Sequence, residues 1–529
     1  MVSFKFRRND EPDREDGPRE HEEEPGQGEP DERSRLLPRD PPAYLSPDDP
    51  AVSPYNLWSI RALRGLSLLF LAISCIWWVF LLVSLFVSPP MMHSRGSGFF
   101  SFAYTTLTVG YLLLGLLFFA VPSKPMTVSG IIIAIFLCVD MIITVSVPHI
   151  RVEEGWVGIA SVVWTTFIAL YTIIQNHSVA WGKREEEERL TGRPETRRPL
   201  REWIAVLLQT VFLVIFAIIS ILFTATLIIR ARDASLPAPG HKYYVTGNKY
   251  QVHLACVGNT STTTTTTHSN NKKKPPTILL EAGEGPVEHT LQPFLDSAYQ
   301  SGLIDRYCYW DRPGFGWSDN SPSPYSAGMA ADALSEALAL AGEQGPWILV
   351  SAGIGDIYSR IFASRHLLEV SGILLIDPTH EDYLSNIGSP GRGFLLWLRG
   401  VFSPLGLDRL AGAIFKGRTR EDRVYGRSAF QTGKVVKALL QENLVARSMT
   451  ASEVQTARHV QMADTPLVVV SSGVEARKSQ RWAKAQEDLT LITKNLKDWD
   501  VVDDAPHEVW SVVEGRRVIE KRLKELVGK

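Results

Sequence analysis

Five long apolar segments fill most of the first half of this 529-residue chain and restrict how it can fold. Each holds about 19 to 26 residues, enough for a helix to cross a hydrocarbon core of about 30 Å. Buried helices of a soluble protein are the alternative, but five nearly uncharged segments in succession favour membrane spans. The segments lie near residues 65–87, 99–121, 128–147, 156–174 and 204–229. Tryptophans lie mostly near their ends, as in an interfacial aromatic belt.

The charges between these segments predict an orientation. An odd number of spans places the two termini on opposite sides of the membrane. The tail side carries Arg61, Arg64, Lys124, Lys183, Arg184, Arg189, Arg193, Arg197 and Arg198. The other side carries Arg95, Arg151, Arg230 and Arg232. The positive-inside rule therefore places the tail in the cytosol or matrix and the C-terminal half across the membrane. The N-glycosylation acceptor pattern at Asn259 would lie on that far side.

The N-terminal tail, residues 1–60, is acidic and rich in proline, and it has few large apolar side chains. Such a composition predicts a disordered segment. The tail lacks the apolar core of a secretory signal peptide and is too acidic for a typical mitochondrial presequence. Within it, "ERSRLLP" at residues 32–38 resembles the acidic dileucine sorting signals of endosomal and vacuolar membrane proteins.

Charge and cysteine content exclude several classes of function. The net charge of −2 gives no basis for nucleic acid as a partner. Two of the four cysteines, Cys75 and Cys138, lie in apolar segments, and Cys256 and Cys308 lie in expected strands. Their spacing indicates neither a disulfide framework nor a metal site. We therefore expect no metal and no cofactor.

Asp140 is the one ionisable residue well inside an expected span. A carboxylate in this position indicates either a transport pathway or a structural polar contact. No span carries a matching Lys or Arg, and no inverted repeat is evident. We therefore expect Asp140 to bond to Ser or Thr on neighbouring helices, and a transporter is the least favoured function.

The C-terminal part, residues 241–529, alternates short apolar strands with amphipathic helices. This pattern predicts a mostly parallel sheet with helices on both faces. Functional sites in such sheets lie at the carboxyl ends of the strands. The threonine-rich stretch at residues 261–276 is expected to be a loop insertion.

The stretch "ILVSAGIGDIYSRIFASRH", residues 348–366, predicts a strand, a tight turn and a helix. It fits the nucleophile elbow G-x-S-x-G, except that Gly353 stands at the serine position. Glycine has no side chain and cannot form a covalent intermediate. An elbow residue at positive φ costs a non-glycine residue about 1–3 kcal/mol, whereas glycine adopts that conformation freely. Gly353 thus keeps the turn without its nucleophile.

Four motifs occur together between residues 278 and 383: "EAGEG" at 281–285, "DRPGFGWS" at 311–318, "SAGIGD" at 351–356 and "LIDP" at 375–378. In this order and spacing they resemble the esterase-like branch of the α/β-hydrolase superfamily. Joined to the five apolar segments, the domain resembles an uncharacterised fungal family, often labelled mitochondrial integral membrane protein. That family brings no known reaction with it.

The hydrolase resemblance implies roles for further residues. A helical cap is expected over residues 384–464. His507 falls where the family's histidine comes last in the chain, and Glu475 falls near its triad acid, with Asp377 as the less favoured acid. Backbone N–H groups of the Gly283–Glu284–Gly285 turn and of Ile354 would bind an oxyanion.

Two routes would rescue catalysis in the absence of an elbow serine. Ser351 is a candidate nucleophile, but it lies two residues before the turn, about 6.6 Å along a strand. Alternatively, His507 would activate water directly, without a covalent step.

The sequence thus predicts three regions: a tail at 1–60, a transmembrane region at 61–232 and an α/β-hydrolase-like domain at 241–529. The favoured function is a pseudoenzyme that binds a lipid-like or small apolar ligand, or a membrane protein partner. The alternative is a membrane-tethered esterase or lipase with displaced machinery. For location, two options stay open: a mitochondrial membrane from the resemblance, and a vacuolar or endosomal membrane from "ERSRLLP" and Asn259.

Overall fold

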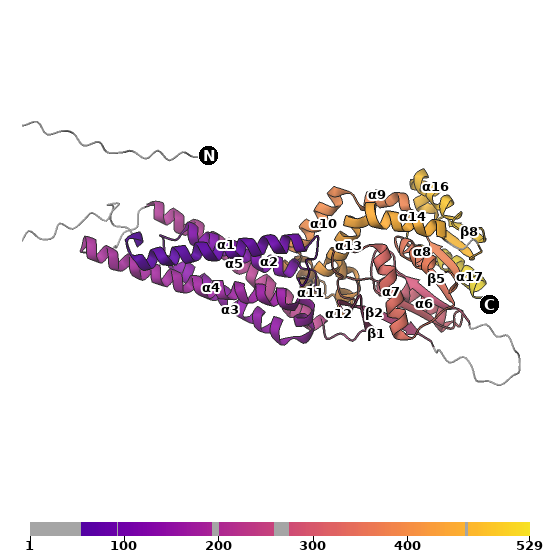
Figure 1. Cartoon of the computed structure of the whole chain (residues 1–529), viewed down its shortest axis with the longest axis horizontal. Helices are drawn as coiled ribbons and strands as arrows, with labels where there is room; N and C mark the ends of the chain where they lie inside the picture. Colours follow the sequence, from indigo (N-terminus) through magenta and orange to yellow (C-terminus); the bar gives the residue numbers. More distant parts are fainter. Residues whose placement is uncertain (1–53, 93, 193–199, 259–274, 461–463, 529) are drawn as a thin grey trace, which may run out of the picture.

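The computed structural model describes residues 54–92, 94–192, 200–258, 275–460 and 464–528. It consists of an elongated helical bundle with a sheet domain at one end (Figure 1). Among the sequence predictions, the dileucine-like segment 32–38 and the acceptor Asn259 lie outside the described residues, as do Arg193, Arg197 and Arg198.

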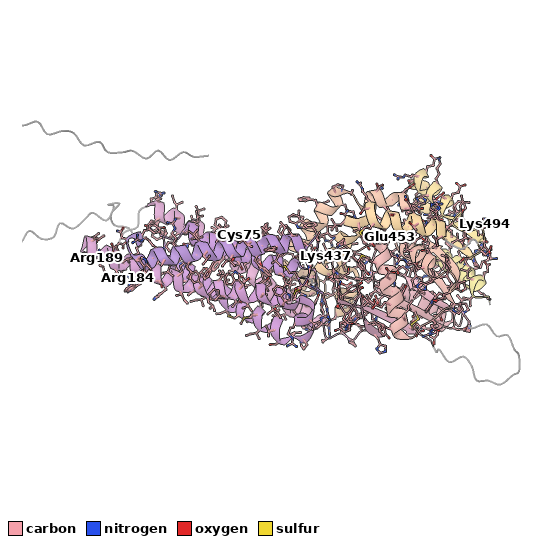
Figure 2. The ribbon with its side chains drawn as sticks, in the orientation of Figure 1. Cys75, Arg184, Arg189, Lys437, Glu453 and Lys494 are labelled. Carbon is pink, nitrogen blue, oxygen red and sulfur yellow. A yellow bond between two sulfur atoms is a disulfide. The ribbon has the colours of Figure 1, made fainter. Side chains whose placement is uncertain are left out.

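Five helices long and apolar enough to cross a membrane form the bundle. They are α1 (Trp58–Ser84), α2 (Phe99–Leu117), α3 (Lys124–Ser146), α4 (Pro148–Thr191) and α5 (Leu200–Asp233). Helix α4 bends at Gly155, whose φ of 61° lies in the left-handed region that favours glycine. The charged end of α4, with Arg184 and Arg189, lies at the end of the bundle far from the sheet domain (Figure 2).

Small polar side chains join the helices of the bundle. Tyr104 of α2 donates a hydrogen bond to Asp140 of α3 at 2.8 Å, and Asp140 is fully buried. Thr108 of α2 bonds Thr165 of α4 at 2.8 Å. Such interhelical hydrogen bonds stabilise bundles in lipid, where helices gain little from apolar burial. The Asp140 carboxylate therefore makes the interhelical contact expected of it, with the Thr224 hydroxyl of α5 as well as with a tyrosine hydroxyl.

The C-terminal domain contains an eight-stranded sheet with the order β1-β2-β4-β3-β5-β6-β7-β8. Strand β2 pairs antiparallel with β1 and β4, and the remaining pairs are parallel. The strands are β1 (His241–Val245), β2 (Tyr250–Val257), β3 (Thr277–Glu281), β4 (Tyr307–Trp310), β5 (Trp347–Ala352), β6 (Val370–Ile376), β7 (Leu467–Ser472) and β8 (Leu496–Val502).

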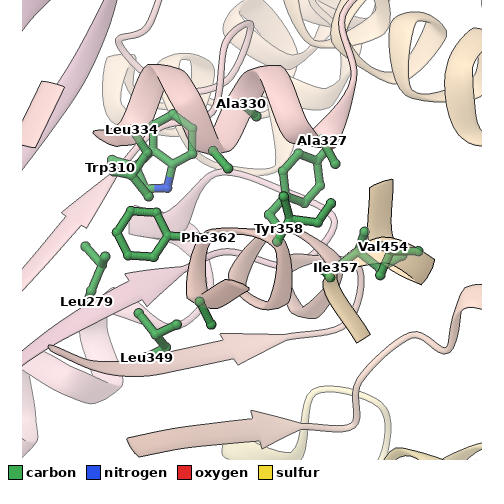
Figure 3. Close-up of a cluster of buried hydrophobic side chains, with 14 of the residues drawn as sticks. Leu279, Trp310, Ala327, Ala330, Leu334, Leu349, Ile357, Tyr358, Phe362 and Val454 are labelled. Atoms are coloured by element: carbon green, nitrogen blue, oxygen red, sulfur yellow. The ribbon is translucent and has the colours of Figure 1, made fainter. Parts of the chain in front are cut away.

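Helices cover both faces of this sheet because successive strand residues point to opposite sides. On one face, Leu279 and Leu349 pack with α7 (Ala327–Ala341) and α8 (Gly355–Arg365); Figure 3 shows this cluster around Phe362. On the other face, their neighbours Leu280 and Ile348 pack with α6 (Gln292–Gln300) and α17 (Val513–Val527). Two short helices, α15 (Gly473–Lys478) and α16 (Gln480–Leu489), follow β7.

The expected cap between residues 384 and 464 is helical in its described part. Its helices are α9 (Leu384–Ile387), α10 (Pro390–Phe402), α11 (Leu407–Phe415), α12 (Arg420–Val424), α13 (Gly433–Val445) and α14 (Ala451–Val460). In α10 and α13, Leu396 and Val436 pack against Leu81 of α1 and Phe99 of α2. Lys437 donates to the Leu85 carbonyl where α1 ends, at the junction seen in Figure 2.

Charged groups add to this junction. Asp233, at the end of α5, accepts hydrogen bonds from Arg409 of α11 at 3.0 Å and from Arg423 of α12 at 2.6 Å. All three side chains are buried. The cap therefore joins the sheet domain to the membrane bundle, together with direct contacts such as the Asn320 N–H, which donates to the Arg95 carbonyl at 2.8 Å.

A disulfide bond joins Cys256 of β2 to Cys308 of β4. The sequence analysis did not expect it, because spacing alone does not show that two strands are neighbours. The two residues are direct partners in the antiparallel register of β2 and β4. A disulfide is typical of a domain that folds in an oxidising compartment, which agrees with the predicted placement of this domain across the membrane.

We expect thiol counting to detect this bond. Denatured, unreduced protein should take up two maleimide groups, on Cys75 and Cys138, and four after reduction. Cys308→Ser should free Cys256, give three groups without reduction and lower the free energy of unfolding by about 2–4 kcal/mol. As a control, Cys75→Ser should lower both counts by one. Uptake of four groups before reduction would contradict the disulfide.

Candidate functional site

Four loops meet at the carboxyl ends of the central strands. Glu284 follows β3, Gly353 follows β5, Asp377 follows β6 and His507 follows β8. Strand β3 has β4 on one side and β5 on the other, so the strands that follow β3 in the chain are added on opposite sides of it. The strand order therefore reverses at β3. This is the place where open α/β sheets form their ligand sites.

Gly353 occupies a strained turn between β5 and α8. Its φ of 51° is in the left-handed region. Its N–H donates to the Ile376 carbonyl at 3.2 Å, and its own carbonyl accepts from the N–H of Thr379 at 2.9 Å. Helix α8 then begins at Gly355, where a Cβ atom would lie only 2.1 Å from the Ala282 carbonyl oxygen. The geometry of a nucleophile elbow is therefore present around a residue without a side chain.

Asp377 is the acid that orients His507. Its Oδ2 lies 2.6 Å from His507 Nδ1. Its Oδ1 accepts hydrogen bonds from the Ser472 N–H and from the Trp482 indole, each at 3.0 Å. The carboxylate is fully buried, so the surrounding donors fix its position and that of the histidine ring.

The expectation that Glu475 orients His507 does not hold in the structure. Ser472 caps α15 and accepts a hydrogen bond from the Glu475 N–H at 3.0 Å. Glu475 lies in the first turn of α15, and its carboxylate pairs with Lys478 of the same helix at 2.7 Å. Both acids follow a strand, as the sequence predicted. Only Asp377, at the end of β6, has its carboxylate beside His507.

Glu284 brings a carboxylate to the elbow. An ideal Cβ atom built on Gly353 would lie 2.5 Å from its Oε1 and 2.8 Å from its Oε2. The same Oε1 accepts the Ile354 N–H at 3.3 Å and lies 3.4 Å from His507 Nε2. Glu284 thus occupies the space of the missing side chain and one expected oxyanion donor. The sequence analysis considered only the backbone N–H of Glu284 and missed the role of its side chain. The signal for that role was an acidic residue between two glycines.

The charges of this cluster support one another. Partial burial lowers the pKa of His507, but the hydrogen bonds that its ring donates to Asp377 and Glu284 outweigh it and raise the pKa to about 10. For Glu284, desolvation alone would raise the pKa. The hydrogen bond with His507 and the charge of His507 outweigh it, so the pKa of Glu284 lies below its usual range. Near neutral pH the histidine is therefore an imidazolium between two carboxylates, and it has no lone pair with which to accept a proton.

The structure does not bring Ser351 to this cluster. It is fully buried inside β5, where its register partners are Glu281 and Leu375. The two ring nitrogens of His507 face Asp377 and Glu284 instead. The other oxyanion-turn residues are also engaged, because the Gly283 carbonyl accepts from Arg312 and a Cβ on Gly285 would meet the Phe430 ring.

One buried group of possible metal ligands exists elsewhere in the described part of the domain: His253, Glu288 and Asp311, with ligand atoms within 4.8 Å of one another. Asp311 already bonds His253 Nδ1 at 2.9 Å and the Trp317 N–H at 2.9 Å. Burial and the Asp311 charge raise the pKa of Glu288 well above its usual range.

Comparison with known proteins places the chain among uncharacterised fungal proteins. An uncharacterized protein of Schizosaccharomyces pombe is 35% identical over 532 aligned residues, which cover 94% of this chain and 96% of that protein. The chain belongs to its family. An uncharacterized vacuolar membrane protein of Saccharomyces cerevisiae is 23% identical and covers 74% of each chain. Residues 32–256 match a family described as a region of unknown function (DUF2417).

Solved structures resemble the C-terminal domain in fold alone. An α/β-hydrolase enzyme from a deep-sea metagenome library covers 55% of this chain and 98% of its own, with 12% identity and a TM-score of 0.39. The haloalkane dehalogenase DbeA of Bradyrhizobium elkani covers 54% and 97%, with 14% identity and a TM-score of 0.37. The predicted architecture, five apolar helices long enough to cross a membrane followed by a mostly parallel sheet with helices on both faces, is confirmed by the helices and the sheet order themselves. The chain is a membrane protein with this domain.

The charge cluster predicts a pH window of stability. The raised pKa of His507 stabilises the fold below pH 6.5, and this contribution is lost as pH rises toward about 10. The lowered pKa of Glu284 stabilises the fold above pH 4.5, and that contribution is lost as pH falls. We therefore expect the difference in melting temperature between the natural protein and His507→Gln to be largest near pH 5–6.5 and to shrink toward pH 10.

A matched control is His289→Gln, which alters an exposed histidine outside the cluster. Its effect on the melting temperature should vary little over the same range. Glu284→Gln should move the upper limit of the window to lower pH, because the histidine loses one of its two carboxylates. A His507→Gln difference that stays constant from pH 5 to pH 10 would contradict the charged cluster.

Proposed function

We propose that this protein is a multi-pass membrane protein whose hydrolase-like domain is non-catalytic and binds a lipid-like ligand at the membrane. The observation that carries the first part is the Glu284 carboxylate, which occupies the place of a nucleophile beside Gly353. The second part rests on the cap, which packs on the ends of the membrane helices.

The chemistry of the elbow supports this proposal. Acyl transfer needs a nucleophile, a neutral base and donors aimed at a developing oxyanion. Here Gly353 supplies no attacking atom, and His507 is charged. The Ile354 N–H faces a carboxylate, whose negative charge opposes an oxyanion at the same place. An esterase would first have to move the Glu284 side chain away from the elbow. Because that side chain is exposed, it has room to move, and the alternative function depends on this movement.

We place the protein in the vacuolar membrane, with the tail in the cytosol and the hydrolase-like domain in the lumen. The printed name of the Saccharomyces cerevisiae relative supports this location, and the relatives reported above give no support to the mitochondrial option. The Cys256–Cys308 bond supports a domain that folds on the oxidising side. The helices also place Lys183 and Arg184 at the end of the bundle opposite the domain.

Gly353→Ser tests the non-catalytic reading directly. We expect no ester hydrolysis above background, because the new side chain meets the Glu284 carboxylate and a charged His507. We expect the free energy of unfolding to fall by about 1–3 kcal/mol, because serine is strained at this positive φ. Hydrolysis of short p-nitrophenyl esters and urea unfolding are the measurements.

The double variant Gly353→Ser/Glu284→Ala separates charge from strain. It should recover the part of the stability that contact with Glu284 costs, and any activity in it should vanish when His507→Ala is added. The natural protein should not react with a fluorophosphonate probe. Labelling of the natural protein that is lost in Ser351→Ala, or hydrolysis by Gly353→Ser at unchanged melting temperature, would make the esterase function the better one.

Protease protection on sealed vacuolar vesicles tests the orientation. A tag at the N-terminus should be cleaved from the cytosolic side, and a tag at Lys529 should be cleaved only after the membrane is opened with detergent. Cleavage of both tags from one side would contradict the five-span arrangement. Co-fractionation with mitochondria instead of vacuoles would contradict the location without affecting the span count.

A further inference from the structure

A cavity of about 230 Å³ lies where the cap and the sheet domain meet the membrane bundle. None of Glu284, Gly353, Asp377 or His507 lines it, so it is separate from the elbow. Its walls come from α2 and α5 of the bundle, from α11, α12 and α13 of the cap, and from the "DRPGFGWS" loop. The cavity therefore lies at the junction of the bundle and the C-terminal domain, beside the start of α2 and the end of α5.

One part of the lining is strongly cationic. The lining cations are Arg230, Lys242, Arg409, Arg423 and Lys434, against the two lining carboxylates Glu153 and Asp233. Five cations less two carboxylates leave a surplus of three positive charges, or two when Glu154, which also pairs with Arg230, is included. Arg409 and Arg423 share the single carboxylate of Asp233. The surplus favours an anion.

The opposite part of the lining is apolar. Phe100 and Tyr104 come from the first turns of α2, and Phe223 and Leu227 come from the last turns of α5. The Arg230 guanidinium lies over the Phe100 ring, 5.4 Å from its centroid, and joins the two parts. An occupant that fits both parts has an anionic group and an apolar group next to each other.

Two buried N–H donors on the lining residues find no acceptor among the residues that the structure describes: Arg409 Nε and Trp317 Nε1. Their side chains are 7% and 9% exposed. Leaving a buried donor unpaired costs about 1–3 kcal/mol, so such groups indicate a missing partner. Burial and the nearby guanidinium groups also lower the pKa of Arg409 to about 10, although Asp233 opposes this.

We propose that this cavity binds the phosphate group of an anionic lipid, with Arg409, Arg423, Lys434 and Trp317 around the phosphate and the first part of the acyl chains on Phe100, Phe223 and Leu227. The Arg409 Nε–H and the Trp317 indole N–H donate to the phosphate oxygens. The N–H groups of Arg423 already bond Asp233 and the Arg418 carbonyl, so Arg423 contributes positive charge, as Lys434 does. The volume fits a headgroup and the adjoining carbons, while longer chains continue into the bilayer. This site names the ligand of the proposed binding role and rests on it, but not on the state of the elbow.

The alternative is that these cations serve only to hold the cap on α5 through Asp233. That alternative accounts for the ion pairs, but not for the Trp317 donor or for Lys434. Lys434 donates to the Gly316 carbonyl at 2.9 Å, and burial lowers its pKa. The structural alternative also does not account for the aromatic wall next to the cations.

The experiment uses the purified full chain in a sugar detergent, with Kd taken from tryptophan fluorescence and from the rise in melting temperature. The probes are dihexanoyl phosphatidic acid, dihexanoyl phosphatidylcholine and inorganic phosphate. We expect phosphatidic acid to bind about tenfold more tightly than either of the others, because phosphatidylcholine carries no net negative charge and inorganic phosphate has no apolar part. Arg409→Gln should weaken its binding about tenfold, and Trp317→Phe about fivefold.

Matched controls come from the same junction. Arg420 donates to the Arg232 carbonyl at 2.6 Å but does not line the cavity, so Arg420→Gln should not change the Kd. Trp397 also has an indole N–H without an acceptor among the described residues, outside the cavity, so Trp397→Phe should not change it either. Trp317→Phe keeps an aromatic side chain and removes the N–H, so it tests the site even if Arg409→Gln fails to fold.

Three results would overturn the proposal. Equal binding of phosphatidylcholine would show that the cations are not used. Equal binding of inorganic phosphate would reduce the site to a free-anion site. Equal weakening by Arg409→Gln and Arg420→Gln would show a structural role at the junction. A fluorophosphonate-reactive protein that still binds phosphatidic acid in the expected way would refute only the non-catalytic function.

Discussion

The hydrogen bond between Asp377 and His507 fixes the rest of the elbow. Asp377 is held at the end of β6 by donors from β7 and α16, so the imidazole that it orients has one position. The second ring nitrogen then faces the space beside Gly353. In a chain without a side chain there, that space would be a half-buried cationic face next to bare backbone donors. The Glu284 carboxylate, which is more than half exposed, fills it and balances the charge.

This balance explains why the turn persists without its nucleophile. Glycine adopts the positive φ of the elbow without strain, so the strand, turn and helix keep their packing. The backbone donor that would stabilise an oxyanion in an enzyme instead binds a fixed carboxylate. An oxyanion hole holds negative charge only during a reaction, whereas the Glu284 carboxylate places a lasting negative charge there, in agreement with the proposed non-catalytic function.

Sequence reasoning found most of the fold and only part of the site. Apolar length gave the five helices, and alternating strands and helices gave the sheet, because both patterns are local. The partner of His507 depends on which strand end faces it, so Glu475 and Asp377 were not distinguishable by order alone. The side chain of Glu284 and the Cys256–Cys308 bond depend on contacts between segments far apart in the chain, which no local pattern records.

The position of the cap links the two halves of the molecule. In the sequence it is an insertion expected to cover the elbow, yet its helices α10, α11, α12 and α13 also contact the membrane bundle. Closing the cap onto the bundle creates a cavity between charged cap residues and aromatic helix ends that neither half forms alone. A domain anchored by that many buried contacts cannot swing away from the bilayer easily. In the proposed function, ligand exchange at this junction proceeds along the membrane surface, which favours an amphiphile from the bilayer over a solute from water.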